Sequence, residues 1–228
     1  MAATLTDTAM PARRPGDGRG VGLLALATGL AAFVLLAFHP GGDAHDFAGV
    51  LKNEAANRGM DALVHGGFIV VLALQAVCYA VFSARLGWRK PATVAGFVFF
   101  CVGASFLAGS MVLDGLVTPA VAARYLAAPA KIEYARALFV LIGTLIGVLM
   151  PAGIAFQAGA FAAWGAALAS NGRRVAGAFG LLLGAAMIAG VAAGIATANP
   201  IALMGGIVGT ALWALIAGSV LLQTEMRA

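Results

Sequence analysis

Charged residues are scarce in this sequence. Asp, Glu, Lys and Arg together make up 10% of its 228 residues, whereas soluble domains average about 25%. Hydrophobic residues make up 62%, and the mean hydropathy is +0.97. So few charges leave little polar surface for a soluble domain, and the composition therefore predicts an integral membrane protein.

Cysteine and histidine are also rare. The two cysteines, Cys78 and Cys101, fall in apolar stretches, and there is no C-x-x-C motif, so a thiol-redox function is not expected. The H-E-x-x-H motif of zinc hydrolases is absent as well. A b-type haem needs two histidines that face each other across helices. Only His39 and His65 could do so, and His39 adjoins a proline, so haem is not expected either.

Long apolar runs fill most of the chain. A helix needs roughly 20 consecutive apolar residues to cross a bilayer, and the continuous character of the runs excludes the alternating strands of a β-barrel. Six runs lie at about 20–38, 62–84, 92–116, 137–168, 175–197 and 201–222. The prediction is an all-α, polytopic membrane helix bundle with six transmembrane helices within 19–228, preceded by a flexible cytoplasmic tail at 1–18.

Basic residues are divided unevenly between the two sides of such a bundle. One side would hold nine of the 14 Lys and Arg residues and the other would hold five. Cytoplasmic loops carry an excess of Lys and Arg, so both termini are predicted to be cytoplasmic in a bacterial inner (plasma) membrane. The loops at 39–61 and 117–136 would then face the periplasm, with 46–60 as a short interfacial helix. The net charge of +5 reflects topology, and no nucleic-acid partner is predicted.

Ionisable residues are concentrated at the outward end of the predicted bundle. All three histidines lie within 27 residues of one another. Ionisable groups near lipid carry a free-energy cost, so those inside spans are functional candidates by default. Imidazole and carboxylate are ligands that Zn, Cu(II), Fe and Ni accept. The predicted ligands are His39, His65, Asp114, Asp61, His45 and Asp43.

Helix geometry explains why these residues can meet. Asp61 and His65 are four residues apart and share a helix face. His39 ends the first span, where Pro40 stops the helix, and Asp114 lies at a similar depth near the end of the third span. The sequence therefore predicts an outward pocket that binds one transition-metal ion of the zinc or copper class.

Methionine favours copper within that class. Met60, Met111 and Met204 are predicted near the outward face, and thioether together with imidazole suits copper, although Met is also common core filler. A ligand position left open to water would permit Lewis-acid hydrolysis, whereas a closed shell would make the site structural or a metal relay. Whether the protein is an enzyme therefore stays open.

Two arginines form a second candidate site. Arg124 and Arg136 bracket the segment before the fourth span, where a lipid headgroup phosphate or a substrate carboxylate could bind. Glu133 lies three residues before Arg136, so an ordinary ion pair is the alternative.

Glycine pairs at four-residue spacing predict close helix packing in the bilayer. The pairs are Gly143/Gly147, Gly180/Gly184, Gly190/Gly194 and Gly205/Gly209. Such faces also suit a homo-oligomer or a partner membrane subunit. The alternative to a metal-binding protein is therefore a non-enzymatic accessory subunit of a membrane complex, or a small lipid or solute transporter, with a metal-free polar cluster.

Overall fold

The computed structural model describes residues 17–40, 46–197 and 200–225, and all regular structure in these ranges is helical. Six of the helical stretches are long and apolar enough to cross a membrane. Six long apolar helices thus occur where the six apolar runs were predicted to form helices. The helical bundle has the make-up of a multi-pass membrane protein.

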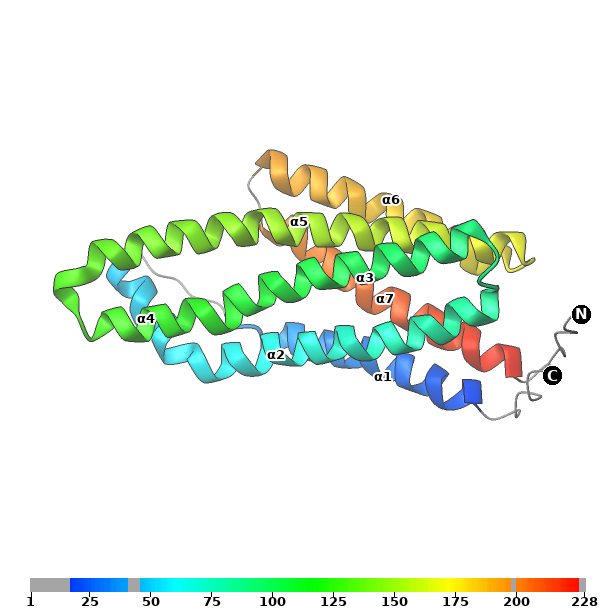
Figure 1. Ribbon diagram of the computed structural model, residues 1–228, viewed down its shortest axis with the longest axis horizontal. Helices are drawn as coiled ribbons and strands as arrows, with labels where there is room; N and C mark the ends of the chain where they lie inside the picture. Colours follow the sequence, from blue (N-terminus) through cyan, green and yellow to red (C-terminus); the bar gives the residue numbers. More distant parts are fainter. Residues whose placement is uncertain (1–16, 41–45, 198–199, 226–228) are drawn as a thin grey trace, which may run out of the picture.

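The elements follow one another with short connections. They are α1 (Asp17–Ala37), α2 (Phe47–Leu86), α3 (Pro91–Val112), the π-helical turn η1 (Leu113–Val117), α4 (Thr118–Leu126), the 3₁₀ turn η2 (Pro129–Lys131), α5 (Ile132–Ser170), α6 (Arg174–Thr197) and α7 (Pro200–Glu225). Because α3, η1 and α4 form one continuous span, six crossings bring the start of α1 and the end of α7 to the same end of the bundle (Figure 1). We call this the termini end and the opposite end the site end.

The spans differ greatly in length. Helices α1, α6 and α7 have 21, 24 and 26 residues, which corresponds to roughly 31 to 39 Å and matches a bilayer. Helices α2 and α5 have 40 and 39 residues, or roughly 60 Å. The long helices, together with α4, continue past the others at the site end (Figure 1). We call this part, formed by residues 47–61, α4 and residues 132–139, the extension.

The extension corrects the predicted interfacial helix at 46–60 and the predicted loop at 117–136. The side chain of Asp46 accepts a hydrogen bond from the Gly49 backbone at 2.7 Å and caps α2, which then runs without a break into its span. A small core of Leu51, Ala122 and Ala135 joins the three elements. Apolar side chains of its own therefore keep the extension helical, and the sequence pattern alone did not show this packing.

A buried aromatic cluster fills the termini end of the bundle. It consists of Tyr79, Phe82, Phe100, Phe161, Trp164 and Trp213, none more than 1% exposed. The rings of Trp164 and Trp213 are stacked with centroids 6.2 Å apart, and the Trp164 indole donates to the Ser83 hydroxyl at 3.0 Å. A Cβ at Gly96 would lie 2.7 Å from that indole. Glycine there lets α3 approach Trp164 closely.

Glycine also brings α6 against α5. A Cβ at Gly180 would lie 2.8 Å from the Phe161 carbonyl oxygen, and one at Gly184 would lie 2.6 Å from the Ala158 carbonyl oxygen. At Gly143 and Gly147 a Cβ would meet nothing within 4 Å. The first pair therefore packs helices within the chain, whereas the second pair lies on an open face of α5.

Candidate metal centre

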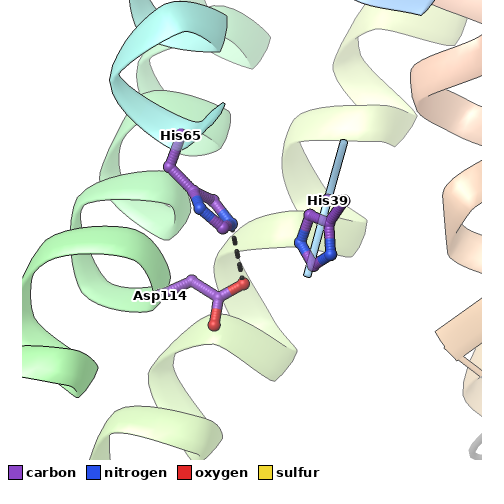
Figure 2. A group of neighbouring side chains, drawn as sticks. All are labelled: His39, His65 and Asp114. Carbon is purple, nitrogen blue, oxygen red and sulfur yellow. Dashed lines mark hydrogen bonds and ion pairs between the residues drawn. The ribbon is translucent and has the colours of Figure 1, made fainter. Parts of the chain in front are cut away.

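Three side chains from separate parts of the chain converge at the site end. His39 follows α1, His65 lies in α2, and Asp114 lies in η1 (Figure 2). One ligand atom from each residue lies within 4.8 Å of the others. His65 Nε2 is 3.2 Å from Asp114 Oδ2, and the two imidazole centroids are 5.0 Å apart. The structure thus brings together three of the six residues that the sequence analysis selected.

His65 is oriented by its own helix. Its Nδ1 lies 2.9 Å from the backbone carbonyl oxygen of Asp61, one turn earlier. A carbonyl oxygen can only accept, so Nδ1 carries the hydrogen and donates it. The ring is 5% exposed, and the Nε2 atom is therefore the one presented to Asp114.

His39 is oriented in a related way. It lies just past α1, where Pro40 ends the helix, and its Nδ1 is 3.1 Å from the Pro40 carbonyl oxygen. Both histidines thus use Nδ1–H as a donor to backbone and keep Nε2 for another partner. Metal-binding histidines characteristically donate their second ring N–H to a carbonyl or a carboxylate, which fixes the tautomer and the ring direction.

The π-helical turn places Asp114. Pro119 has no N–H to donate to the Gly115 carbonyl, and its ring would clash with that carbonyl in a regular α-helix. The helix widens over Leu113–Val117 instead, and the Thr118 hydroxyl donates to the Leu113 carbonyl at 2.9 Å. Single π-turns of this kind occur frequently at functional sites.

Gly115 is a site residue that sequence reasoning missed. A Cβ at this position would lie 2.3 Å from both Cβ and Cγ of His65, far inside van der Waals contact. Only glycine lets the widened turn approach the imidazole so closely. One feature of the sequence could have indicated this role: Asp114 and Gly115 adjoin each other inside an apolar run, and Gly115 lies four residues before Pro119.

A small cavity adjoins the three candidate ligands. Its volume is about 20 Å³, enough for one ion or one water molecule. It is lined by His39, His65, Asp114, Ser110, Phe68, Ile207, Met111, Met150 and Met204. The buried Ser110 hydroxyl has no hydrogen-bond partner among the described residues. Met111 and Met204 therefore lie where the sequence placed them, whereas Met60 is 41% exposed and does not line the cavity.

The remaining predicted ligands are Asp61, Asp43 and His45. The group of close ligand atoms does not include Asp61, which instead offers its backbone oxygen to His65. Asp43 and His45 fall outside the described residues, so their participation stays a prediction.

Glu54, in the extension, is a further acidic neighbour that was not predicted as a site residue. It precedes the apolar part of α2 by about two turns. Burial, together with the nearby Asp61 and Asp114 carboxylates, raises its pKa to about 7. Four ionisable groups (Glu54, Asp61, His65 and Asp114) are therefore close enough to influence one another's charge.

The two arginines of the second candidate site have different surroundings. The Nε atom of Arg136 is 3.5 Å from Glu133, and its guanidinium lies 4.7 Å from the centroid of the Phe47 ring. Arg124 lies exposed in the last turn of α4. Arg136 thus forms the ion pair considered as the alternative, and joint anion binding by the two arginines stays a prediction.

The contact between His65 Nε2 and Asp114 Oδ2 is compatible with a protonated His65 and with a metal ion. With Nδ1 protonated, a neutral His65 directs the lone pair of Nε2 at the carboxylate, so either a proton or a metal ion must lie between them. Ligand bonds of 2.0–2.2 Å put tetrahedral ligand atoms about 3.4 Å apart, close to the observed 3.2 Å. The residues could hold a metal. Comparisons with protein-family models, with curated proteins and with solved structures gave no match.

Proposed function

We propose that this protein binds one transition-metal ion of the zinc or copper class through His39, His65 and Asp114, at the periplasmic face of a bacterial inner membrane. The observation that carries the proposal is the shared arrangement of the two histidines. Each donates Nδ1–H to a backbone carbonyl, and each belongs to a group of ligand atoms within 4.8 Å of one another. A chance cluster of polar residues has no reason to fix both tautomers in this way.

The site's location favours a bound ion over a solvated polar cluster. His65 is buried, and apolar side chains such as Phe68 and Ile207 line the same cavity. The buried imidazole of His65 is costly in such surroundings unless it is paired, and its partner Asp114 is 37% exposed. Three protein ligands leave one position of a tetrahedral ion for water or another side chain. Water there would permit Lewis-acid hydrolysis, and a side chain would make the site structural or a metal relay.

Elemental analysis by ICP-MS of protein purified in detergent without chelators tests the proposal. Wild type is expected to contain close to one equivalent of metal. The double variant His65→Ala/Asp114→Ala, checked for folding by circular dichroism, is expected to contain none. The matched control is Glu133→Ala/Arg136→Ala, which removes an exposed ion pair in the extension and should retain the metal. A wild-type protein without metal, also after addition of zinc or copper, would overturn the proposal.

One observation favours the second candidate, a non-enzymatic accessory subunit or small lipid or solute transporter with a metal-free polar cluster. Gly143 and Gly147 leave open space on an exposed face of α5 that also carries Val140 and Val148, 66% and 64% exposed. Small residues at this spacing allow a second helix to approach closely. If this face binds a partner subunit or a second copy, Gly143→Leu/Gly147→Leu should dissociate the complex seen by native mass spectrometry. A monomer in both proteins would contradict that role.

A further inference from the structure

Three methionines share the cavity with the candidate ligands. Met111 comes from α3, Met150 from α5 and Met204 from α7, and all three line the cavity of about 20 Å³ beside His65 and Asp114. The chain has eight methionines, so three of them meet at one point from three different helices. Three thioether side chains, two imidazoles and a carboxylate therefore border the space for an ion.

We propose that the ion bound at this site is copper, and that the methionines make the site selective for Cu(I) over Zn(II). This inference rests on the metal site proposed above. Thioether is a soft ligand that favours Cu(I), whereas structural and catalytic zinc sites use thiolate, imidazole and carboxylate. Thiolate is not offered, because neither cysteine lines the cavity.

The same lining disfavours hard cations. Calcium takes six to eight oxygen ligands and magnesium takes six. Asp114 is the single carboxylate among the residues that line the cavity, and the Ser110 hydroxyl is the single other side-chain oxygen. Two imidazole and three thioether side chains therefore outnumber the two oxygen-bearing side chains in this lining. Such a lining favours copper over hard cations.

Methionine as ordinary core filler explains less of the arrangement. Flexible methionine side chains serve to fill irregular gaps, yet here a cavity remains between them and the candidate ligands. Met187, in contrast, fills its surroundings: a Cβ at Gly209 would lie 2.6 Å from its sulfur. The cavity walls at Phe68 and Ile207 are apolar, so few waters would compete with sulfur for the ion.

A metal competition experiment tests the inference on the full-length protein. Cu(I) affinity is measured against the chelator bathocuproine disulfonate under anaerobic, reducing conditions, and Zn(II) affinity is measured against a chromophoric zinc chelator. The variants are Met111→Leu/Met150→Leu/Met204→Leu, which conserves side-chain volume, and Met60→Leu as the matched control. Met60 is exposed and lies on α2 outside the cavity. Met204→Leu alone serves if the triple variant does not fold.

The methionine substitutions are expected to change the affinity for Cu(I) and not the affinity for Zn(II). Wild type should bind Cu(I) more tightly than Zn(II), and the triple variant should lose about 100-fold in Cu(I) affinity while its Zn(II) affinity stays within twofold. Met60→Leu should match wild type for both metals. Tight Zn(II) binding with Cu(I) affinity unchanged in the triple variant would overturn the copper inference and leave the metal site standing. A wild type that binds neither metal would overturn both.

Discussion

The two ends of the bundle bury different kinds of side chain. At the termini end, six aromatic side chains are almost completely buried; the Trp164 indole is paired with the Ser83 hydroxyl, whereas the Tyr79 hydroxyl and the Trp213 indole have no partner among the described residues. At the site end, His65 and Asp114 come together beside a small cavity, and the Ser110 hydroxyl has no partner among the described residues. Aromatic packing stabilises the termini end, whereas potential metal ligands border a cavity at the site end.

The difference shows where function can reside in a chain with so few charges. The stacked tryptophans and the close glycines maximise van der Waals contact between helices. A binding site must instead keep a space and the groups that border it, even at a cost in stability. The combination of a cavity, two oriented histidines and a π-turn occurs at the site end. Four predictions can break or sharpen this contrast.

The largest effect on stability is expected at the termini end. Trp164→Ala should lower the free energy of unfolding by about 3–5 kcal/mol, because a fully buried indole is replaced by a cavity. The folded fraction should still bind its metal, since Trp164 does not line the site cavity. Thermal melting followed by ICP-MS on the folded fraction measures both effects. Loss of metal from well-folded Trp164→Ala would show that the two ends are not independent.

Gly115→Ala should destabilise the protein less than Trp164→Ala does, but it should abolish metal binding. The added Cβ would overlap His65, so the imidazole must move, at a cost of about 1–3 kcal/mol. Metal content should fall to background. The control is Gly66→Ala, next to His65 in the same helix, where a Cβ would meet nothing within 4 Å. That variant should keep the metal and gain roughly 0.5–1 kcal/mol from helix propensity. Full metal occupancy in Gly115→Ala would refute the geometry described for the site.

Gln75 and Gln157, fully buried between the two ends, form a matched pair. Neither amide atom of Gln75 has a partner among the described residues, whereas the Gln157 oxygen accepts a hydrogen bond from Thr210 and only its nitrogen has no partner there. Gln75→Met should therefore raise the free energy of unfolding by about 1–3 kcal/mol, the penalty of an unpaired buried group. Gln157→Met should gain less than Gln75→Met, because it also removes the hydrogen bond from Thr210, whose hydroxyl keeps the Gly206 carbonyl as an acceptor. Equal losses in chemical denaturation would mean that Gln75 has a bound partner of its own.

The smallest effect is expected at Glu54 and depends on pH. The carboxyl loses its proton near pH 4.5 when unfolded and near pH 7 when folded. The unfolded state therefore ionises first, and stability is lost as pH rises from about 4.5 through 7. Glu54→Gln removes this dependence, so its melting temperature should exceed that of wild type at pH 8 and approach it at pH 5. Glu133→Gln, an exposed position, is the control. Parallel melting curves for wild type and Glu54→Gln would contradict the raised pKa.

Much of the fold follows from the sequence, because the thickness of a bilayer sets the length of the apolar runs that can cross it. Hydropathy alone predicts the six long helices. An even number of them places the start of α1 and the end of α7 at the same end of the bundle. The extension did not follow, since residues 47–61 and 118–126 are too polar to be read as spans and are helical through contacts such as Leu51 with Ala122. Tertiary packing of this kind has no local signal.

The candidate site was predictable in its charged members and in Met111 and Met204, but not in Gly115 and Met150. His39, His65 and Asp114 stand out because ionisable residues are rare inside spans. Gly115 and Met150 are common residue types in an apolar chain, and only the geometry shows that one admits His65 and the other lines the cavity. The hydrogen bond from His65 to the Asp61 carbonyl could not be predicted either, because every residue carries a backbone carbonyl.

X-ray absorption spectroscopy at the edge of the bound metal tests the central claim most directly. The site described here predicts nitrogen and oxygen ligands at about 2.0–2.2 Å with the multiple-scattering signature of two imidazoles, and the copper inference adds sulfur scattering from methionine. That signature should fall to one imidazole in His39→Ala. A spectrum without imidazole scattering, or one unchanged by His39→Ala, would contradict the claim that His39, His65 and Asp114 hold the metal.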